Sequence, residues 1–343
     1  MTTPITIENI EDSAALADYL KAGGYVRPDE TPEIRVLPGG VSNRTVWVRL
    51  SDGTALVLKQ ALSKLRVKVD WFSSVERIHR EAAGLRWLSR SMPSGLTPAF
   101  VFEDHDNHIL AMTAIPEPHE NWKQQLLKGE IDADYMRQFG EILAYIHRSA
   151  DSDPDAARAE FQDQSFFESL RLEPYYAYAA EQVPQAADFL QQLIADTRQR
   201  HVAIVHGDYS PKNILIYEGK LIILDYEVIH FGDPAFDIGF SLTHLLSKAL
   251  FLPSQRQALY DGALLYWQTY LETLNKPEWM ATLEPAGVKH TLACLMARAA
   301  GRSPLEYLSL EQRQEQQQIV LDLIKQLPTS IPQLILAYHN RLS

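Results

Sequence analysis

The chain is poor in cysteine and in positive charge. Cys294 is the only cysteine among 343 residues, so no disulfide can form within the chain and a cluster of thiolate metal ligands is excluded. Lys and Arg together number 32 against 44 Asp and Glu, which gives a formal net charge of -12. A protein of this charge is a poor candidate for unspecific binding to nucleic acid.

Signals for export or for membrane insertion are also missing from the sequence. The first residues, Met1 to Pro4, lack a basic region followed by an apolar core, so we expect no signal peptide. No apolar run is long enough to span a bilayer, and we expect a cytoplasmic protein that does not bind membranes. The length allows two domains or one large bilobal domain, and the sequence leaves the oligomeric state open.

The first third of the chain has the pattern of a small antiparallel sheet with two helices. Segments rich in β-branched and aromatic residues alternate with turn signals such as Ser51-Asp52-Gly53. Apolar residues recur at helical spacing after residue 70, with Glu81 on or beside the apolar stripe. The expected strands are 34–37, 45–50, 55–59, 100–102 and 109–113, and the expected helices are 10–21 and 70–90.

After a break at Ile115-Pro116-Glu117-Pro118 the pattern becomes mainly helical. We therefore expect a small lobe of sheet and helix over 1–115 and a larger, mainly helical lobe over 116–343. Within the second lobe, 202–205 and 214–224 form an island of strand character, and Glu218-Gly219 turns the second segment back on itself. The expected helices are 135–148, 189–197 and those after residue 234, with breaks near Pro253, Pro285 and Pro304.

Polar side chains stand at the strand ends of this island. Asp208 follows the apolar run 202–205, while Asn213 and Asp225 flank the predicted hairpin. Because the hairpin strands are antiparallel, Asn213 and Asp225 lie at the same end and their oxygens can converge. Mg²⁺ prefers oxygen ligands and takes few of them from protein, which leaves room for phosphates. A carboxylate outside the metal shell, Asp208, can then orient a hydroxyl group for phosphorylation.

These residues carry a resemblance to a known family. His206-Gly207-Asp208, Asn213 and Asp225-Tyr226-Glu227 resemble the catalytic core of the protein-kinase-like fold in its small-molecule branch, the aminoglycoside phosphotransferase and choline kinase family. Phe236 to Gly239 is also typical of that branch. The resemblance covers about residues 34 to 300. It implies an α+β, bilobal fold with a small antiparallel-sheet N-lobe and a larger, mostly helical C-lobe.

The resemblance also implies roles for individual residues and the cofactors of the reaction. Asp208 would be the catalytic aspartate, Asn213 and Asp225 would bind Mg²⁺, and ATP would supply the phosphoryl group. Glu227 would either assist the metal or be structural. His206 and Asp237 would brace the catalytic loop. The implied activity is transfer of phosphate to a hydroxyl of a small-molecule acceptor.

The predicted first lobe supplies the expected nucleotide contacts. Lys59 ends the third strand, where a kinase places its phosphate-binding lysine, and Glu81 is the expected partner of this lysine. Glu76 is the alternative, but Arg80 at i+4 indicates a surface pair. The turn near residue 40 would cover the phosphates with backbone N–H groups, or would be an ordinary hairpin turn. The residues expected to contact the nucleotide, with adenine at the hinge, are Gly39, Gly40, Ser42, Asn43, Thr113 and Ile115.

A finer resemblance, carried by Val57 to Leu62 and by Asp225-x-Glu227, is to methylthioribose kinases. The catalytic loop Tyr209 to Asn213 is closer to general phosphotransferases. In place of the arginine pair that those kinases direct at the sugar, only Arg298 and Arg302 are candidates. The acceptor therefore stays open among sugars, amino alcohols such as choline, and aminoglycosides. The alternative function is a catalytically silent nucleotide-binding regulatory protein on the same fold.

Two further groups of residues have competing interpretations. The stretch Asp104-His105-Asp106-Asn107-His108 has metal-ligand side chains, but a polar hairpin tip is the favoured interpretation. Tyr175, Tyr176 and Tyr178 either line a substrate pocket or pack in the core.

Overall fold

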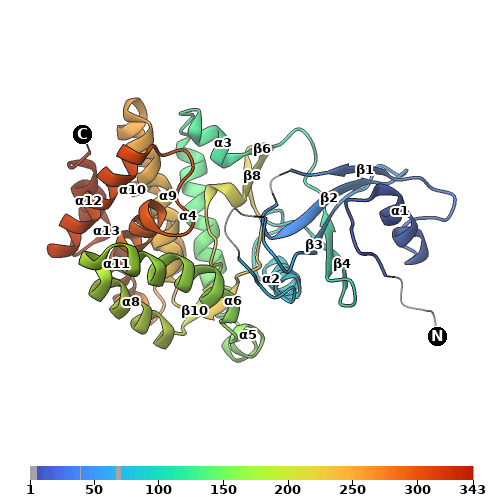
Figure 1. Ribbon diagram of the computed structural model, residues 1–343, viewed down its shortest axis with the longest axis horizontal. Helices are drawn as coiled ribbons and strands as arrows, with labels where there is room; N and C mark the ends of the chain where they lie inside the picture. The colour runs from blue at the N-terminus through green and yellow to red at the C-terminus, as the bar shows by residue number, and fades with distance from the viewer. Residues whose placement is uncertain (1–5, 39, 67–70, 343) are drawn as a thin grey trace. The chain divides into compact units, whose positions relative to one another are not determined.

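A computed structural model describes residues 6–38, 40–66 and 71–342 (Figure 1). The chain forms two compact units, and the first comprises the residues up to His119 together with the short stretch Asp225–Glu227. The second unit contains Glu120–Leu224 and everything after Glu227. The boundary expected after Ile115 thus differs from the observed one, because the chain leaves the first unit only after His119 and returns to it once.

The first unit is built on a five-stranded antiparallel sheet with the strand order β1-β2-β3-β5-β4. All five expected strands are present, with ends that differ from the expected ones by up to two residues. The elements of this unit are α1 (Ser13–Ala22), β1 (Glu33–Val36), β2 (Asn43–Arg49), β3 (Ala55–Ala61), α2 (Arg77–Ser91), β4 (Phe100–Asp104) and β5 (Ile109–Thr113).

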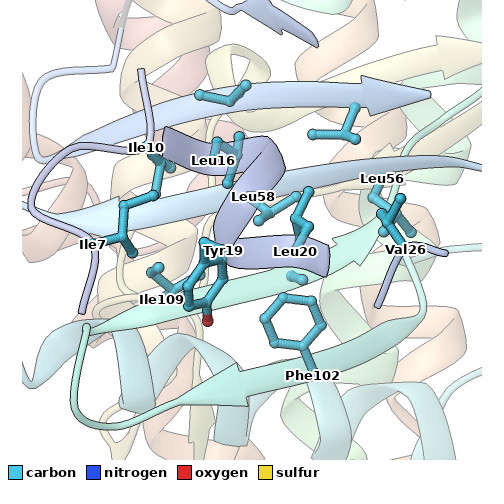
Figure 2. Packing of buried hydrophobic residues seen from close by; sticks show 13 residues of the cluster. Ile7, Ile10, Leu16, Tyr19, Leu20, Val26, Leu56, Leu58, Phe102 and Ile109 are labelled. Carbon is cyan, nitrogen blue, oxygen red and sulfur yellow. The ribbon is translucent and has the colours of Figure 1, made fainter. Parts of the chain in front are cut away.

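The helix α1 covers one face of this sheet. Figure 2 shows Leu16, Tyr19 and Leu20 of α1 directed at side chains of the sheet, among them Leu58 and Phe102. Each fully buried side chain of this size contributes about 1.5–3 kcal/mol relative to an exposed one. Because successive residues of a strand face opposite sides, the burial of Leu58 against α1 turns its neighbour Lys59 to the other face of the sheet.

The helix α2 packs against β3, β4 and β5. Asp70, its expected start, lies outside the described residues, but residues 71–76 are not helical and the helix begins at Arg77. Part of the preceding chain pairs with an earlier segment instead, and the N–H of Ser73 donates to the carbonyl of Ser63 at 3.1 Å. Arg77 in addition donates to the carbonyl of Ser74 at 2.8 Å. These contacts compete with a helical conformation before Arg77.

The second unit is mainly helical. Its small β elements are a three-stranded sheet, β6-β8-β9, and the pair β10-β7. The elements are β6 (Glu120–Asn121), α3 (Trp122–Leu127), α4 (Ala133–Arg148), α5 (Pro154–Phe161), α6 (Ser165–Phe167), η1 (Glu168–Ala177), α7 (Tyr178–Gln182), η2 (Pro184–Ala186), α8 (Ala187–Gln199), β7 (Ala203–Val205), η3 (Pro211–Asn213), β8 (Ile214–Tyr217), β9 (Lys220–Ile223), β10 (His230–Gly232), α9 (Ala235–Phe251), η4 (Pro253–Gln255), α10 (Arg256–Leu274), α11 (Met280–Ala300), α12 (Leu310–Lys325) and α13 (Ile331–His339).

The predicted hairpin in this unit is present as β8 and β9. Ile214 is paired with Ile223, and the N–H of Leu224 donates to the carbonyl of Asn213 at 2.9 Å. Asn213 and Leu224 therefore lie side by side at the open end of the hairpin. Asp225 follows Leu224 directly in the chain.

The break expected near Pro285 was wrong, because this proline lies inside α11. It is in the second turn, and the carbonyl that loses its helical partner belongs to the exposed Ala281, where water can replace the bond. In the described part of the chain, no single helix is long and apolar enough to cross a membrane. One pair of helices is long and apolar enough when its two members are taken together, but it is bent between them; these are Ala235–Phe251 and Pro253–Leu274.

Candidate active site

A buried lysine between two carboxylates is the main feature of the first unit. The Nζ of Lys59 in β3 lies 2.6 Å from Oε1 of Glu81 in α2 and 3.0 Å from Oδ1 of Asp225. The side chains of Lys59 and Asp225 are 14% and 18% exposed, whereas that of Glu81 is fully buried. Of the two acidic residues considered as partners of Lys59, the structure brings Glu81 to it.

The apolar stripe of α2 explains this choice. Ile78, Ala82 and Leu85 are completely buried, and Glu81 lies among them on the same side of the helix. A carboxylate at such a position is stable only with a cation beside it. Lys59 on the facing surface of the sheet is that cation.

The electrostatics of this group follow from burial and from charge. Burial by itself would lower the pKa of Lys59, but Asp225 and Glu81 outweigh it and raise the pKa, so the ammonium stays charged. Burial raises the pKa of Glu81 above its ordinary value, while Lys59 opposes this shift. Oε2 of Glu81 is buried and accepts no hydrogen bond from any residue that the structure describes.

Arg77 organises the surroundings of Glu227. Its Nε lies 3.2 Å from Oε2 of Glu227, and its Nη2 donates to the carbonyls of Ser42 and, at 2.8 Å, of Leu62. Burial and the nearby Asp225 raise the pKa of Glu227, and Arg77 opposes the rise. Arg77 thus ties Glu227 to the turn after residue 40. The structure shows a structural contact of Glu227, and its possible role at a metal stays a prediction.

The turn between β1 and β2 is tight. A Cβ atom at Gly40 would lie 2.4 Å from the carbonyl oxygen of Asn43, so a side chain does not fit there. Asn43 donates to Oγ of Ser42 at 3.3 Å, while its own Oδ1 is buried and has no hydrogen-bond partner among the described residues. Gly39, which was expected to contact the nucleotide, lies outside the described residues.

The predicted hinge residues lie at the end of β5 and just after it. Thr113 is the final residue of β5, and its Oγ1 accepts a hydrogen bond from the N–H of Ala99 at 2.8 Å. Ile115 is half-buried two residues later. Their expected contact with adenine stays a prediction.

In the second unit, Asp208 and Asn213 are joined by their side chains. The Nδ2 of Asn213 donates to the carbonyl oxygen of Asp208 at 3.0 Å and to its Oδ2 at 2.8 Å. Arg171 approaches the other carboxylate oxygen of Asp208, with its Nη2 at 3.1 Å from Oδ1. Lys212 is more distant, with its Nζ at 3.9 Å from Oδ2.

The buried Asp237 fixes the backbone of this loop. Its two carboxylate oxygens accept the N–H groups of His206 at 2.7 Å and of Gly207 at 2.9 Å. His147 adds a contact of 3.2 Å through its Nε2. Burial by itself would raise the pKa of Asp237, but the hydrogen bond and charge of His147 and the other partners outweigh it and lower the pKa. The carboxylate is therefore ionised and holds the loop that leads into Asp208.

His206 also works as a brace. Its Nε2 lies 3.2 Å from the carbonyl oxygen of Leu224, and its Nδ1 lies 3.2 Å from the backbone N of Asp208. The N–H of Asp208 donates to Nδ1, so the proton of the neutral ring is on Nε2 and is donated to Leu224. With both nitrogens used in this way, the ring connects the loop to the end of β9.

Gly207 gives the loop its sharp turn. Its φ is +76°, a conformation that residues with a side chain rarely adopt. A Cβ atom there would also lie 2.8 Å from Cγ1 of Val228. Both observations agree with the unusual backbone expected at this strand exit.

The candidate acceptor residues, Arg298 and Arg302, lie in different surroundings. Nη1 of Arg298 donates to the hydroxyl of Tyr175 at 3.1 Å and to the carbonyl of Ser303 at 2.6 Å. Its Nε is buried and has no partner within the described residues. Arg302 is exposed and stacks over the ring of Tyr178 at 5.2 Å. The structure does not bring these two guanidinium groups together.

Arg298 shares its aromatic neighbours with Arg171 instead. The rings of Tyr175 and Phe240 are stacked with centroids 5.9 Å apart, and both guanidinium groups lie within 6 Å of each ring. The buried His244 is close enough for Arg298 to lower its pKa, an effect second only to burial. Asp208 is thus flanked by a region of positive potential.

The sequence profile of the phosphotransferase enzyme family matches residues 33–273, which is more than half of the chain. This chain belongs to that family. The match contains Lys59 and Glu81 as well as the whole segment from His206 to Asp237. The protein is therefore an enzyme, a kinase of small molecules.

Curated relatives of this phosphotransferase include methylthioribose kinases. That of Cronobacter sakazakii (strain ATCC BAA-894) is 25% identical over 343 aligned residues, which cover 86% of this chain and 84% of the relative. That of Bacillus velezensis (strain DSM 23117 / BGSC 10A6 / LMG 26770 / FZB42) is 24% identical, with 78% of this chain and 74% of the relative covered.

Solved structures show that the phosphotransferase has the expected α+β, bilobal, protein-kinase-like fold. An amicoumacin kinase in complex with AMP-PNP, Ca²⁺ and Ami matches with a TM-score of 0.59 at 14% identity, over 90% of this chain and 92% of that one. The Plasmodium vivax ethanolamine kinase also has a TM-score of 0.59, at 12% identity, over 93% and 90% of the two chains.

Three side chains of this phosphotransferase were missed by the sequence analysis. They are Arg77, which holds Glu227, Arg171, which holds Asp208, and His147, which contacts Asp237. None of them stands in a recognisable motif. Arg77 is completely buried, so a lone arginine within the apolar pattern of the helix was the one available signal.

Proposed function

We propose that the protein is an ATP- and Mg²⁺-dependent kinase that phosphorylates a hydroxyl group of a small sugar. The observation that carries this proposal is the position of Lys59, whose ammonium group is held by Glu81 and Asp225. A buried cation with two carboxylate partners can exchange one of them for a phosphate oxygen without leaving its place. Lys59 would then draw charge from the phosphates of ATP, while Glu81 keeps its ammonium in position.

The residues assigned to Mg²⁺ have the right chemistry for it. Asn213 donates to Asp208 through Nδ2 and would offer its Oδ1 to the cation, and Asp225 would contribute a carboxylate. Oxygen donors of this kind suit Mg²⁺, which takes one or two carboxylates or amides together with phosphates and water. When bound, Mg²⁺ would neutralise the charge on the phosphate oxygens during transfer.

Asp208 is the proposed catalytic residue. Arg171 and Asn213 fix its two carboxylate oxygens, so the group is oriented before the acceptor arrives. It would position the acceptor hydroxyl and accept its proton as the oxygen attacks the terminal phosphate. Asp237 and His206 would keep the supporting loop rigid during this step.

The positive potential beside Asp208 favours a sugar over a cationic acceptor. Arg171 and Arg298 both flank the Tyr175–Phe240 pair, and two guanidinium groups repel an ammonium such as that of choline or of an aminoglycoside. They attract the hydroxyl oxygens of a sugar, to which guanidinium groups donate. The methylthioribose kinases among the relatives act on a sugar, which agrees with this preference.

An acceptor screen tests the proposal. A thermal shift with ATP and Mg²⁺ measures nucleotide binding, and an assay of ATP consumption then compares methylthioribose and other pentoses with choline, ethanolamine and aminoglycosides. We expect turnover with a sugar and at least ten times lower kcat/KM with the cationic acceptors. Nucleotide binding without turnover on any acceptor would favour the catalytically silent alternative.

A further inference from the structure

A cluster of histidine and glutamate side chains connects α2 to the β4–β5 hairpin in the first unit. Glu76 directly precedes α2, and His79 lies in its first turn. Glu103 comes from β4, while His105 and His108 come from the hairpin loop between β4 and β5. None of these residues takes part in the phosphotransfer site described above.

Three ligand atoms in this cluster have the spacing of a metal site. Nε2 of His79 lies 3.2 Å from Nδ1 of His108, and this Nδ1 lies 3.6 Å from Oε1 of Glu76. All three atoms lie within 4.8 Å of one another. Two ligand atoms on a tetrahedral zinc ion, each about 2.0–2.1 Å from the metal, are about 3.3 Å apart. A small adjustment of the exposed Glu76 side chain would complete this arrangement.

Glu103 supplies the orientation that a metal-binding histidine requires. Nδ1 of His79 lies 2.6 Å from Oε1 of Glu103, so the N–H on Nδ1 donates to this carboxylate. The lone pair of the neutral ring is then on Nε2, which is the atom that faces His108. Arg86 holds the other oxygen of Glu103. Metal-ligating histidines usually donate their second nitrogen to a carboxylate in this way, which fixes the ring and raises its basicity.

The burial and charge of the cluster agree with this arrangement. The side chain of His79 is only 11% exposed, so its ring is held in place by the surrounding side chains. Arg86 lies beside Glu103 as a cation, while the carboxylate accepts from His79. His108 has a φ of +50°, and the tip of the hairpin therefore adopts a strained conformation that carries its ring.

A second group of three side chains in the same cluster fits a metal site less well. Nδ1 of His79, Oε1 of Glu103 and Nε2 of His105 are also close together. The distance of 2.6 Å between the first two atoms is that of a hydrogen bond and is too short for two ligands of one metal. His105 instead stacks on the ring of His79 with centroids 4.0 Å apart, and its side chain is 71% exposed.

Asp104, the last residue of β4, is used elsewhere. Asp104 accepts hydrogen bonds from the hydroxyl of Tyr19 at 2.7 Å and from Nδ2 of Asn107 at 2.8 Å. It is therefore part of the hairpin tip, as the sequence indicates. Two histidines of the loop, His105 and His108, contact His79 of α2.

We propose that Glu76, His79 and His108 form a binding site for a divalent transition metal such as Zn²⁺, with Glu103 as the carboxylate that orients His79. Two imidazoles and one carboxylate are a ligand set that zinc accepts, whereas Mg²⁺ prefers oxygen ligands alone. The metal connects the hairpin to α2, the helix that carries Glu81. Metal binding therefore stabilises the first unit independently of nucleotide.

Zinc titration of the untagged full-length protein tests this site. Excess Mg²⁺ is present throughout to occupy the phosphotransfer ligands, and the readouts are calorimetric stoichiometry, the melting temperature and the visible absorption of Co²⁺ as a substitute. We expect one Zn²⁺ per chain and a rise of the melting temperature, as mass action requires for a ligand that binds only the folded chain. Co²⁺ should show the intense absorption of a tetrahedral site.

Four variants define the ligands. His108→Ala and Glu76→Gln should each weaken zinc binding at least tenfold, and Glu103→Gln should weaken it ten- to a hundredfold through His79. His105→Ala is the matched control, because it removes a ring stacked on His79 without removing a ligand, and it should retain the affinity within about threefold. Failure of the wild type to bind zinc under these conditions, or an equal loss in His105→Ala and His108→Ala, would overturn the proposal. Circular dichroism of each variant separates a lost ligand from a misfolded chain.

Discussion

The ammonium group of Lys59 lies 2.6 Å from the carboxylate of Glu81, and both side chains are shielded from solvent. The pair joins β3 to α2, so the position of the helix and the position of the lysine are set together. Neither residue can be replaced without leaving a charge buried, because the partner keeps its place in the apolar packing.

Replacement of either member should therefore cost both activity and stability. We expect Lys59→Met to lower kcat/KM for ATP at least a hundredfold, because the lysine would contact the phosphates directly. Glu81→Gln should lower it about tenfold, because the glutamate only holds the lysine in position. Steady-state kinetics with varied ATP measure this. Lys220→Met, at an exposed position in β9, is the control. Equal activity of Lys59→Met and wild type would contradict the assignment.

Asp208→Asn should abolish proton transfer and keep the shape of the side chain. We expect kcat to fall by about 10²–10⁴, the usual contribution of a general base, while the affinity for Mg-ATP changes by less than about threefold. Rapid-quench measurement of a single turnover and calorimetric titration with a non-hydrolysable nucleotide separate the two quantities. Asp188→Asn, at an exposed site in α8, should behave as wild type. Turnover near the wild-type level in Asp208→Asn would remove this residue from the mechanism.

Asp237→Asn should destabilise the second unit in a pH-dependent way. An amide can accept only one of the two N–H groups from His206 and Gly207, and the unpaired buried donor costs about 1–3 kcal/mol. The pKa of Asp237 is lowered from its ordinary value of 3.8, so its ionised form stabilises the folded state above that pH. This stabilisation is lost as the pH falls through the lowered folded-state pKa.

Urea denaturation at a series of pH values checks the prediction. The difference in unfolding free energy between wild type and Asp237→Asn should be largest at neutral pH and should shrink on acidification below about pH 4. A difference that does not depend on pH would mean that the carboxylate charge is unimportant for this contact.

Gly207→Ala tests the tight turn before Asp208. A left-handed conformation costs a residue with a side chain about 1–2 kcal/mol, and the contact with Val228 adds to this cost. We expect kcat to fall at least tenfold as the loop shifts. Gly219→Ala is the matched control, since its φ of +74° is nearly the same but no atom lies within 4 Å of the added Cβ. Comparable losses in both variants would show that backbone strain alone is responsible.

Arg298→Met and Arg302→Met distinguish the two candidate acceptor arginines. Arg298 has a buried unsatisfied donor and shares aromatic partners with Arg171, whereas Arg302 is exposed. We expect Arg298→Met to raise KM for the sugar acceptor at least tenfold with little change in KM for ATP, and Arg302→Met to raise it by less than threefold. Initial rates with varied acceptor measure both. A larger effect at Arg302 would move the proposed acceptor site from Tyr175 towards Tyr178.

Much of the fold could be predicted from local patterns. The strands of the first unit follow from β-branched residues and turn glycines, and the hairpin of β8 and β9 follows from Glu218-Gly219 between two apolar runs. The start of α2 could not be predicted, because Ser73 pairs with Ser63 and Arg77 bonds to nearby carbonyls. These competing contacts arise only when distant segments meet.

In the candidate site, too, the sequence determined some features and the tertiary structure determined others. The sequence alone determined the residue types and the order of Lys59, Glu81, Asp208, Asn213 and Asp225, because the chemistry of phosphate and Mg²⁺ limits the choice of side chains. Only the tertiary structure decided which partners hold them. Arg77, His147 and Arg171 reach their carboxylates from distant parts of the chain, and His79 and His108 meet across α2 and a hairpin. A side chain makes contact where the fold brings it, and its position in the sequence does not say which distant residue will be its partner.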